Sequence, residues 1–461
     1  MGAQGTQPDP PPPGGTERVG LFDGVLARGR VREAVGDRAW LQAMLDVEAA
    51  LARAQARVGL LPAEHAEAIT RACRAGAFDL AAIGEAAAAS GNPVVPLVRA
   101  LTAAVPGAAA GAVHSGATSQ DVLDSAAMLV AHRALGPLLD DLEAAAAAAA
   151  GLADAHRGTV MAGRTLLQQA LPITFGLKAA GWLVGLDEAA RRLEELRRTR
   201  LAVQLGGAAG TLASLGPAGG EVLAALADEL GLAEPALPWH TVRTRVAELA
   251  GALGTAAGVA GKVARDVTLL AQTEVAEVRE RGPAGRGGSS TLPHKRNPVA
   301  AVAALACAEQ APGLVATLLA AMVQEHERAA GAWHAEWRPL GDLLRTTGSA
   351  VAWLRDSLER LEVDPERMRR NLDATGGLLL AERVTTALAP GLGRLAAHDL
   401  VREACAEALA SRRPLAEVLC DRPEVRDLLD PGEVANLLDP AGYLGSAEAF
   451  IDRALRARPE R

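Results

Sequence analysis

Aromatic side chains are scarce in this chain, making up 2% of its 461 residues, and this scarcity limits the folds it can adopt. Apolar residues still account for 49% of the sequence, so a large core must be built from alanine, leucine and valine. Such a composition favours closely packed helices over a strand-rich sandwich. Because the chain is longer than one core usually accommodates, we expect two or three domains.

Several other features are missing, and each absence excludes a class of protein. The net charge is −8 and no long basic stripe occurs, which argues against a nucleic-acid partner. The four cysteines form no CxxC pair, so we expect neither a disulfide framework nor a zinc site. No basic, apolar leader opens the chain, and its weakly polar stretches read as shorter than a membrane span. We therefore expect a cytoplasmic protein that is not held by a membrane.

Lysine is also rare, because only Lys178, Lys262 and Lys295 occur among 47 lysines and arginines. Arginine is the usual basic residue of this chain. A lysine inside a candidate active-site loop is therefore a more specific signal than it would be in an average protein.

The apolar pattern predicts an all-α fold, in which a central elongated bundle of long helices carries smaller helical N- and C-terminal domains. Residues 1–18 are rich in proline and predict a disordered tail. We place the N-terminal helical domain at 19–110, the bundle at 111–361 and the C-terminal helical domain at 362–461. Within the bundle we expect long helices at about 119–153, 166–202, 241–281, 298–328 and 334–361, and we find no strand pattern.

Helices of this length with so much alanine and leucine have more than one apolar face. Association of subunits would cover the second face. The alternative is a monomer whose helices are shorter and kinked.

Chemistry-bearing residues concentrate in the segment that runs from Arg281 to Pro298, RGPAGRGGSSTLPHKRNP. Its glycines make the first half flexible. Pro298 suits the first position of the following helix with Asn297 as the N-cap, which would bring Ser289, Ser290 and Lys295 near a helix N-terminus that favours an anion. A glycine–serine linker ending in a capped helix would explain less, because it leaves the PHKRNP sequence behind the paired serines unaccounted for. A phosphate-binding P-loop does not fit either, because its Gly-Lys-Ser/Thr ending is absent.

The sequence GSSTLPHKRNP at 288–298 resembles the signature of the fumarase/aspartase superfamily, which includes adenylosuccinate and argininosuccinate lyases. The resemblance implies that Ser289 is the catalytic base, with Lys295 stabilising its alkoxide. It also implies that Ser290, Arg296 and Asn297 contact the substrate, although Arg296 could instead be a surface charge. The family assembles each active site from several subunits of a homotetramer, and it implies no metal or organic cofactor.

Two further segments resemble other blocks of the same family. HSGATSQD at 114–121 implies Thr118 and Ser119 as hydroxyl donors to a substrate carboxylate, with His114 as a polar neighbour in the substrate-binding site. Taken alone, Thr-Ser-Gln-Asp is typical of a helix cap. GRTLLQQA at 163–170 implies Arg164 as a carboxylate clamp, with Thr165 and Gln168 as hydrogen-bonding groups. The substrate that these residues imply is a small polycarboxylate.

The departures from the family pattern indicate a branch within it. Amine-releasing members carry a histidine at the position of Leu166, and some carry a second at the position of Asn92. Expelling an amine requires a positioned acid, which leucine cannot supply. Lactonisation of 3-carboxy-cis,cis-muconate to 4-carboxymuconolactone, in the protocatechuate branch of aromatic degradation, requires none, because a carboxylate is the group that adds. The chain resembles this cycloisomerase branch of intramolecular lyases most.

Two alternatives remain open at this stage. One is adenylosuccinate lyase, or a related amine-releasing lyase whose acid comes from elsewhere, such as His114. The other is a catalytically silent structural tetramer. The roles of six further side chains are also open. Trp333 and Trp337 are core or pocket residues, His240 and His326 are expected to be structural, and the sequence does not assign His334 or Arg338.

Overall fold

The computed structural model describes residues 20–282, 286–288, 291–292 and 294–458. The predicted tail at 1–18 lies outside these residues. The chain divides into two compact units. The first comprises Met1–Asp141, Ala189–Gly258 and Ala306–Ala352, and the second Leu142–Glu188, Val259–Leu305 and Trp353–Arg461.

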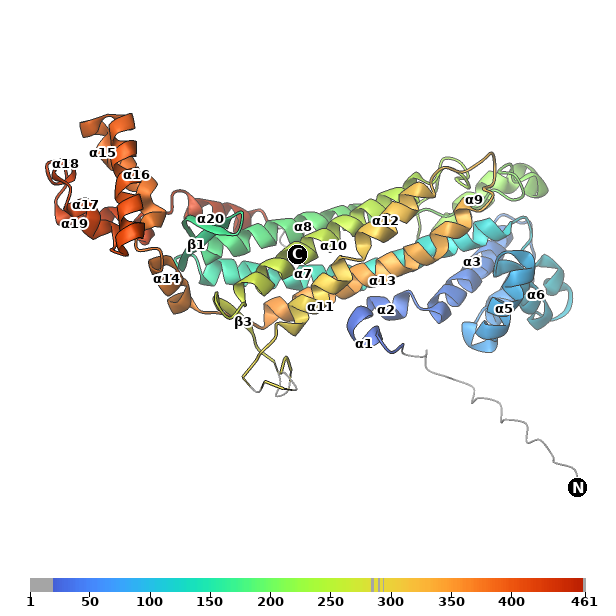
Figure 1. Cartoon of the computed structure of the whole chain (residues 1–461). Helices are drawn as coiled ribbons and strands as arrows, with labels where there is room; N and C mark the ends of the chain where they lie inside the picture. Colours follow the sequence, from blue (N-terminus) through green and yellow to red (C-terminus); the bar gives the residue numbers. More distant parts are fainter. Residues whose placement is uncertain (1–19, 283–285, 289–290, 293, 459–461) are drawn as a thin grey trace, which may run out of the picture. The chain divides into compact units, whose positions relative to one another are not determined.

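Four long helices, labelled in Figure 1, each contribute residues to both units. They are α7 (Ser119–Ala155), α8 (Phe175–Thr199), α10 (Thr244–Leu270) and α13 (Ala332–Glu359). The positions that they bury are mainly alanine and leucine. Alanine lets helices approach closely and leucine fills the remaining space, so a core poor in aromatics still packs. The predicted all-α long-helix bundle is confirmed.

Shorter helices complete the first unit. They are α1 (Asp23–Leu26), α2 (Val31–Ala34), α3 (Asp37–Arg57), α4 (Ala63–Ala72), α5 (Leu80–Ser90), α6 (Val94–Ala104) and α9 (Gly219–Leu230), with α12 (Ala311–Ala320). Asn92, where a family histidine is absent, acts locally at the start of α6. Its side-chain oxygen accepts the N–H of Val94 at 3.0 Å.

The second unit adds two small antiparallel hairpins and the C-terminal helices. The hairpins are β1 (Val160–Thr165) with β2 (Gln168–Thr174), and β3 (Val278–Glu280) with β4 (Leu361–Val363). The helices are α11 (Val299–Ala308), α14 (Pro365–Asp373), α15 (Ala381–Leu392), α16 (Arg394–Ser411), α17 (Leu415–Cys420), α18 (Pro423–Arg426), α19 (Pro431–Leu437) and α20 (Ala447–Arg456).

The C-terminal helices from α15 to α19 share a core cluster of their own, centred on Val384, Leu388, Val401 and Leu415. The last helix, α20, returns to the end of α7. Asp452 accepts a hydrogen bond from Arg157 at 2.6 Å, and Arg458, just beyond α20, donates to Glu143 at 2.6 Å.

Three of the five predicted long helices match α7, α10 and α13, apart from their ends. The prediction for 166–202 is wrong at its start, because residues up to 174 form the β1–β2 hairpin. The prediction for 298–328 is wrong in its continuity, because the helix is interrupted between α11 and α12 and ends at Ala320. Both segments are apolar, as predicted. The hairpin is not predicted because periodicity does not reveal a two-residue turn made of leucines.

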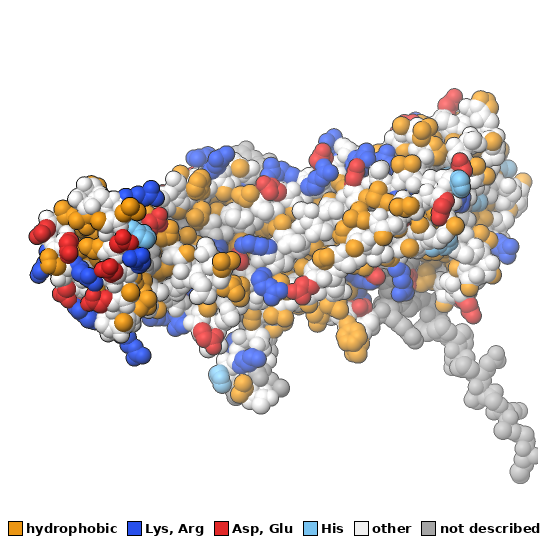
Figure 2. All heavy atoms as spheres, turned by 45° about the horizontal axis from the view of Figure 1, so that its top comes forward, with side chains coloured by type: hydrophobic (Ala, Val, Ile, Leu, Met, Phe, Trp, Pro, Cys, Tyr) orange, Lys and Arg blue, Asp and Glu red, His pale blue; other side chains and the backbone are white. Residues whose placement is uncertain are grey.

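Two helical stretches, Ser119–Ala155 and Val299–Ala320, are long and apolar enough to cross a membrane by length and composition. The expectation that all apolar stretches are shorter than a span is therefore wrong for these two. The apolar window of the first is 72% buried, as in the core helix of a bundle, and that of the second is 39% buried. Figure 2 shows apolar side chains on the face in view, interleaved with arginines and carboxylates.

Candidate active site

The three sequence blocks lie in three different local structures. The block with His114 precedes and opens α7 in the first unit. The block with Arg164 forms the β1–β2 hairpin, and the serine segment connects β3 to α11; both of these belong to the second unit.

His114 is held by a carboxylate from α3. Its Nδ1 lies 2.6 Å from Oε1 of Glu48, whose side chain is almost completely buried. Burial lowers the pKa of His114, but the hydrogen bond and charge of Glu48, together with the charge of Asp121, outweigh burial and raise it above 6.5. The second oxygen of Glu48 is buried and has no hydrogen-bond partner among the described residues. The pair therefore favours a histidine that is a cation, which suits the anionic substrate predicted from the sequence.

Thr118 and Ser119 stand at the N-terminus of α7, where Asp121 organises the backbone. Asp121 Oδ2 accepts the N–H of Thr118 at 3.0 Å and that of Gly207 at 2.9 Å, so this motif does act at the start of the helix. Within the described part of the chain, neither the Thr118 nor the Ser119 hydroxyl has a hydrogen-bond partner. The cap consumes the carboxylate and leaves both hydroxyls available to a ligand.

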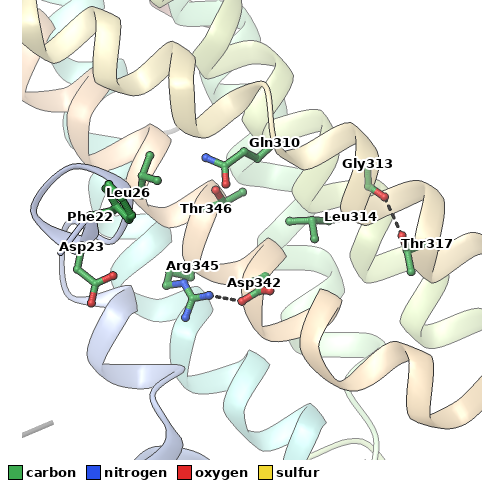
Figure 3. Close-up of a pocket in the computed structure, with 10 residues that line it drawn as sticks. All are labelled: Phe22, Asp23, Leu26, Gln310, Gly313, Leu314, Thr317, Asp342, Arg345 and Thr346. Atoms are coloured by element: carbon green, nitrogen blue, oxygen red, sulfur yellow. Dashed lines mark hydrogen bonds and ion pairs between the residues drawn. The ribbon is translucent and has the colours of Figure 1, made fainter. Parts of the chain in front are cut away.

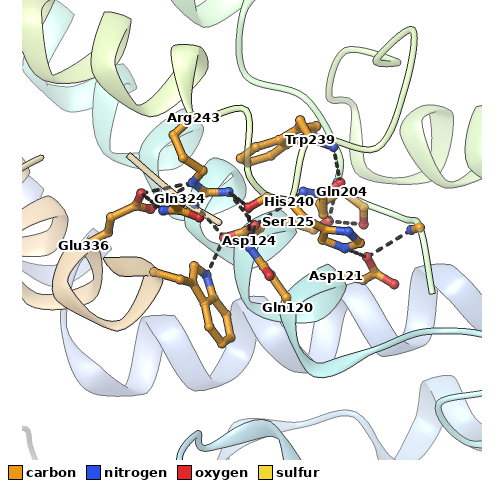
Figure 4. A network of polar contacts seen from close by, with 12 residues as sticks. Gln120, Asp121, Asp124, Ser125, Gln204, Trp239, His240, Arg243, Gln324 and Glu336 are labelled. Carbon is orange, nitrogen blue, oxygen red and sulfur yellow. Dashed lines mark hydrogen bonds and ion pairs between the residues drawn. The ribbon is translucent and has the colours of Figure 1, made fainter. Parts of the chain in front are cut away.

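A buried polar network lies behind this turn (Figure 4). His240 Nε2 lies 2.7 Å from Asp121 Oδ1, and both side chains are buried. That His240 is a structural residue stays a prediction. Arg243 donates to Asp124 at 2.7 and 2.9 Å and to Glu336 at 2.6 Å. Burial lowers the pKa of Arg243, but the two carboxylates raise this pKa by more than burial lowers it. The guanidinium is therefore charged.

Trp333 belongs to the same network. Its indole N–H donates to Asp124 at 3.0 Å, and its ring is buried and packs edge-on against Trp337. Of the two readings left open, the core reading holds for Trp333.

The β1–β2 hairpin presents Thr165 and Gln168 as exposed residues on either side of a two-residue turn. The turn consists of Leu166 and Leu167, which are 97% and 72% exposed. Both have φ values in the left-handed region, +51° and +65°. A branched apolar residue is disfavoured there, where asparagine and glycine are usual.

Arg164 already binds a carboxylate of its own chain. Its two terminal nitrogens donate to Glu277 at 2.9 and 2.7 Å, and Glu277 is fully buried and also accepts from Asn371 at 2.8 Å. A substrate carboxylate would have to share this guanidinium with Glu277. The role of Arg164 as a clamp stays a prediction.

Ser289 and Ser290, the residues on which the chemical prediction depends, lie outside the described residues. The described parts of the segment show how its two ends are joined. Asn297 donates its backbone N–H to Gly287 O at 2.8 Å and its side-chain amide to the same oxygen at 3.2 Å. Gly287 has φ +72°, and an added Cβ would lie 2.5 Å from Asn297 O, so glycine is required there. Lys295 and Arg296 are exposed.

The predicted helix cap is wrong. The helix α11 begins at Val299, after Pro298, and the side chain of Asn297 points back to Gly287 instead of capping it. Glu280 takes the place of the cap, because its carboxylate accepts the N–H groups of Ala300 and Ala301 at 3.0 and 2.9 Å. The anion that this helix N-terminus favours is therefore supplied by the protein itself.

A cavity of about 510 Å³ adjoins the base of this segment. It is lined by arginines and carboxylates of β3 and β4 and by the segment's own ends, namely Arg279, Glu280, Arg281, Arg286, Arg296, Asn297 and Glu362. Arg279 and Arg281 both pair with Glu362, and Arg286 pairs with Asp356 at 2.5 Å.

Another cavity, of about 590 Å³, lies in the first unit between the N-terminal segment and α12 and α13 (Figure 3). None of the predicted site residues lines it. Among the described residues, no group of three or more histidines, cysteines and carboxylates is placed to hold a metal ion.

Glu48, Glu277 and Glu280 were not identified from the sequence. Each is an acidic residue remote from, or outside, the motif that it supports, and none has a distinctive neighbour pattern. Only the fold reveals which of the many carboxylates are buried against the motifs.

Comparison with known proteins gives concordant results. Residues 26–313 match the family described as Lyase, and residues 377–454 match the family described as Adenylosuccinate lyase C-terminus. The chain is 52% identical over 438 residues to a 3-carboxy-cis,cis-muconate cycloisomerase of Bradyrhizobium diazoefficiens, covering 94% of this chain and 97% of the relative. It is 48% identical over 457 residues to a nitrosuccinate lyase of Streptomyces davaonensis, covering 96% of each.

A solved structure supports the same grouping. The crystal structure of 3-carboxy-cis,cis-muconate lactonizing enzyme from Pseudomonas putida superposes with a TM-score of 0.89 at 46% identity. The alignment covers 95% of this chain and 98% of that one.

Proposed function

Because the chain belongs to the fumarase/aspartase superfamily of lyases, we propose that it is an intramolecular lyase that converts 3-carboxy-cis,cis-muconate to 4-carboxymuconolactone. The single observation that carries this proposal is the full-length similarity to cycloisomerases, at 52% identity over 94% of the chain. The proposal assigns the activity in the relative's name to this chain.

The reaction forms one C–O bond and one C–H bond. A substrate carboxylate oxygen adds to the far carbon of a conjugated double bond, and the π electrons move to the carbon beside another carboxylate. That carbon then takes a proton, which we assign to the hydroxyl of Ser289. The trianion becomes a dianion, so each turnover takes up one proton from solvent. Holding the substrate in the cyclising conformer supplies much of the rate, because both reacting groups are in one molecule.

Leu166 supports this choice of reaction. It occupies the position of the family's histidine and cannot transfer a proton. In the reverse reaction the leaving group is a carboxylate, which is stable as an anion, so the reaction does not need an acid at this position.

Positive charge around the substrate is supplied in this proposal by His114 and Lys295, with the Thr118 and Ser119 hydroxyls as donors. His114 is suited to this because Glu48 and Asp121 favour its protonated form. Arg164, Thr165, Gln168, Ser290, Arg296 and Asn297 complete the proposed substrate contacts.

We further propose a cytoplasmic homotetramer with active sites shared between subunits. Exposed apolar side chains along and just after α11 and α12 support association, among them Val302, Leu319 and Val323, the last of which is 85% exposed.

A second candidate follows from the nitrosuccinate lyase relative, which is 48% identical. A lyase acting on nitrosuccinate would expel nitrite, which is also a stable anion and also needs no acid at position 166. Adenylosuccinate lyase is less well supported, because Asn92 stands where its histidine is expected and accepts the N–H of Val94, and Leu166 is apolar.

The test is a direct comparison of substrates. Purified protein is mixed with 3-carboxy-cis,cis-muconate, and loss of the conjugated-diene absorbance is followed; nitrite is assayed in parallel with nitrosuccinate. Diene loss without nitrite release supports the proposal. Nitrite release without diene loss would assign the chain to the second reaction, and turnover of adenylosuccinate alone would reject both.

A further inference from the structure

The first turn of α11 has no free backbone donor. Val299 N–H donates to Asn297 O at 2.9 Å and Val302 N–H to Pro298 O at 3.0 Å. Ala300 and Ala301 donate to the two oxygens of Glu280. The N-terminal groups that most helices leave to solvent or a ligand are thus all used within the chain.

Glu280 has a third partner, the hydroxyl of Ser357 in α13, which donates to Oε1 at 2.6 Å. Glu280 itself ends β3, whose pairing with β4 is extended by Arg281 N–H donating to Arg360 O at 2.9 Å. One carboxylate therefore fixes three elements, namely β3, α11 and the end of α13.

The segment between β3 and α11 is tied at a second point. Arg286 is bound to Asp356 of α13, and Gly287 is bonded to Asn297. An antiparallel bridge also joins Gly288 to Arg296. Lys295 and Asn297 lie in the short stretch just before α11. The position of this stretch therefore depends on where the first turn of α11 is held.

We propose that Glu280 is a positioning residue, an internal anion that fixes the start of α11 and through it Lys295 and Asn297. This inference rests on the proposed function of the serine segment, and it assigns the helix N-terminus to the protein's own carboxylate instead of the substrate's. Glu280 is bound by two N–H groups and one hydroxyl, which leaves it a structural anion that takes no part in proton transfer.

The decisive variant is Glu280→Ala, which leaves an unoccupied anion position at the N-terminus of a ten-residue helix. We expect kcat to fall on the order of 10- to 100-fold, because small displacements of catalytic groups have effects of this size. KM should change by less than about threefold, because Lys295 and Asn297 act mainly on the negative charge that develops in the transition state. Added formate, which fits the space of the deleted carboxylate, should restore most of kcat.

Glu362→Ala is the matched control. Glu362 is a carboxylate in the same cavity and on the strand paired with β3, but it binds Arg279 and Arg281 instead of α11. We expect its kcat, whatever its value, not to respond to formate. Glu280→Gln should also have a lower kcat than the wild type. Formate should not restore it, because the glutamine side chain fills the position without supplying a charge.

A readout independent of turnover separates this inference from the proposed function. Amide hydrogen exchange at Ala300 and Ala301 should accelerate in Glu280→Ala and slow again with formate. Unchanged exchange and unchanged kcat in that variant would overturn the inference, as would a loss of kcat in a folded protein that formate does not restore. Should Glu280→Ala fail to fold, a Glu280→Gln variant with wild-type kcat and wild-type exchange would overturn it as well.

Discussion

Oε1 of Glu48 lies 2.6 Å from Nδ1 of His114 and comes from α3, more than sixty positions earlier in the chain. Burial alone would lower the pKa of His114, but this contact and the charge of Asp121 raise it. The groups that act on this imidazole are therefore Glu48 from α3 and Asp121 from α7. A raised pKa keeps the imidazolium charged at higher pH than an ordinary histidine would be.

The first prediction concerns pH. In the proposed function His114 binds an anionic substrate in its protonated form, so KM should stay low below the raised pKa and increase as pH rises through it. The same sign applies to folding, because a pKa raised in the folded state contributes stability that is complete below the unfolded value and is lost as pH rises through the folded one.

Glu48→Gln should remove the support and move the increase in KM to lower pH. Near neutral pH we expect KM to increase about tenfold, corresponding to one charged hydrogen bond of roughly 1.4 kcal/mol. NMR titration of the His114 imidazole measures the shift directly. An identical titration and KM profile in the variant would contradict this role for Glu48.

The second prediction concerns the turn of the β1–β2 hairpin. Replacing Leu166 with Asn and Leu167 with Gly should raise the free energy of unfolding by about 1 kcal/mol, because leucine is strained in the left-handed region. The same variant should have a lower kcat/KM, because the turn lies between Thr165 and Gln168. Thermal unfolding and turnover measure the two effects.

Leu409→Gly serves as the comparison for that variant. Leu409 is also exposed, but it lies inside α16, where glycine should destabilise by about 1 kcal/mol. Opposite signs for the two changes are expected. A hairpin variant that is destabilised would indicate that the leucines stabilise the turn within the subunit.

The third prediction concerns the buried Arg243. Arg243→Met should lower the free energy of unfolding by about 3–5 kcal/mol, because it leaves Asp124 and Glu336 buried without their counter-charge. Denaturant unfolding measures this. Arg30→Ala, which breaks an ion pair with Asp140 that is more than half exposed, should change stability by less than about 1 kcal/mol. Equal effects of the two variants would show that the buried cluster is not the stabilising element inferred here.

The sequence was sufficient for the bundle, because α7, α10 and α13 are long, continuous and rich in alanine and leucine. It was insufficient at the hairpin, because neither Leu166 nor Leu167 is a residue type that marks a turn. Their conformation is imposed by the pairing of β1 with β2, a contact that periodicity within one segment does not encode.

The candidate site was predictable to the extent that its residues lie in motifs. His114, Thr118 and Lys295 are candidates because their neighbours in the sequence are distinctive. The carboxylates behind them were not, because Glu48, Glu277 and Glu280 act through tertiary contacts with other elements. Asn297 shows the limit within a motif, since its sequence position suits a cap and a glutamate seventeen residues earlier takes that role.

The most direct measurement of the central claim follows the proton to carbon. Wild-type protein and Ser289→Ala are incubated with 3-carboxy-cis,cis-muconate in D₂O, and the product is examined by NMR. We predict that the wild type yields lactone with one deuterium on the carbon beside the carboxylate. The variant should be slower by about 10²–10⁴-fold while its fold and assembly are unchanged. Lactone formation by Ser289→Ala at the wild-type rate would contradict the assignment of Ser289 as the proton donor.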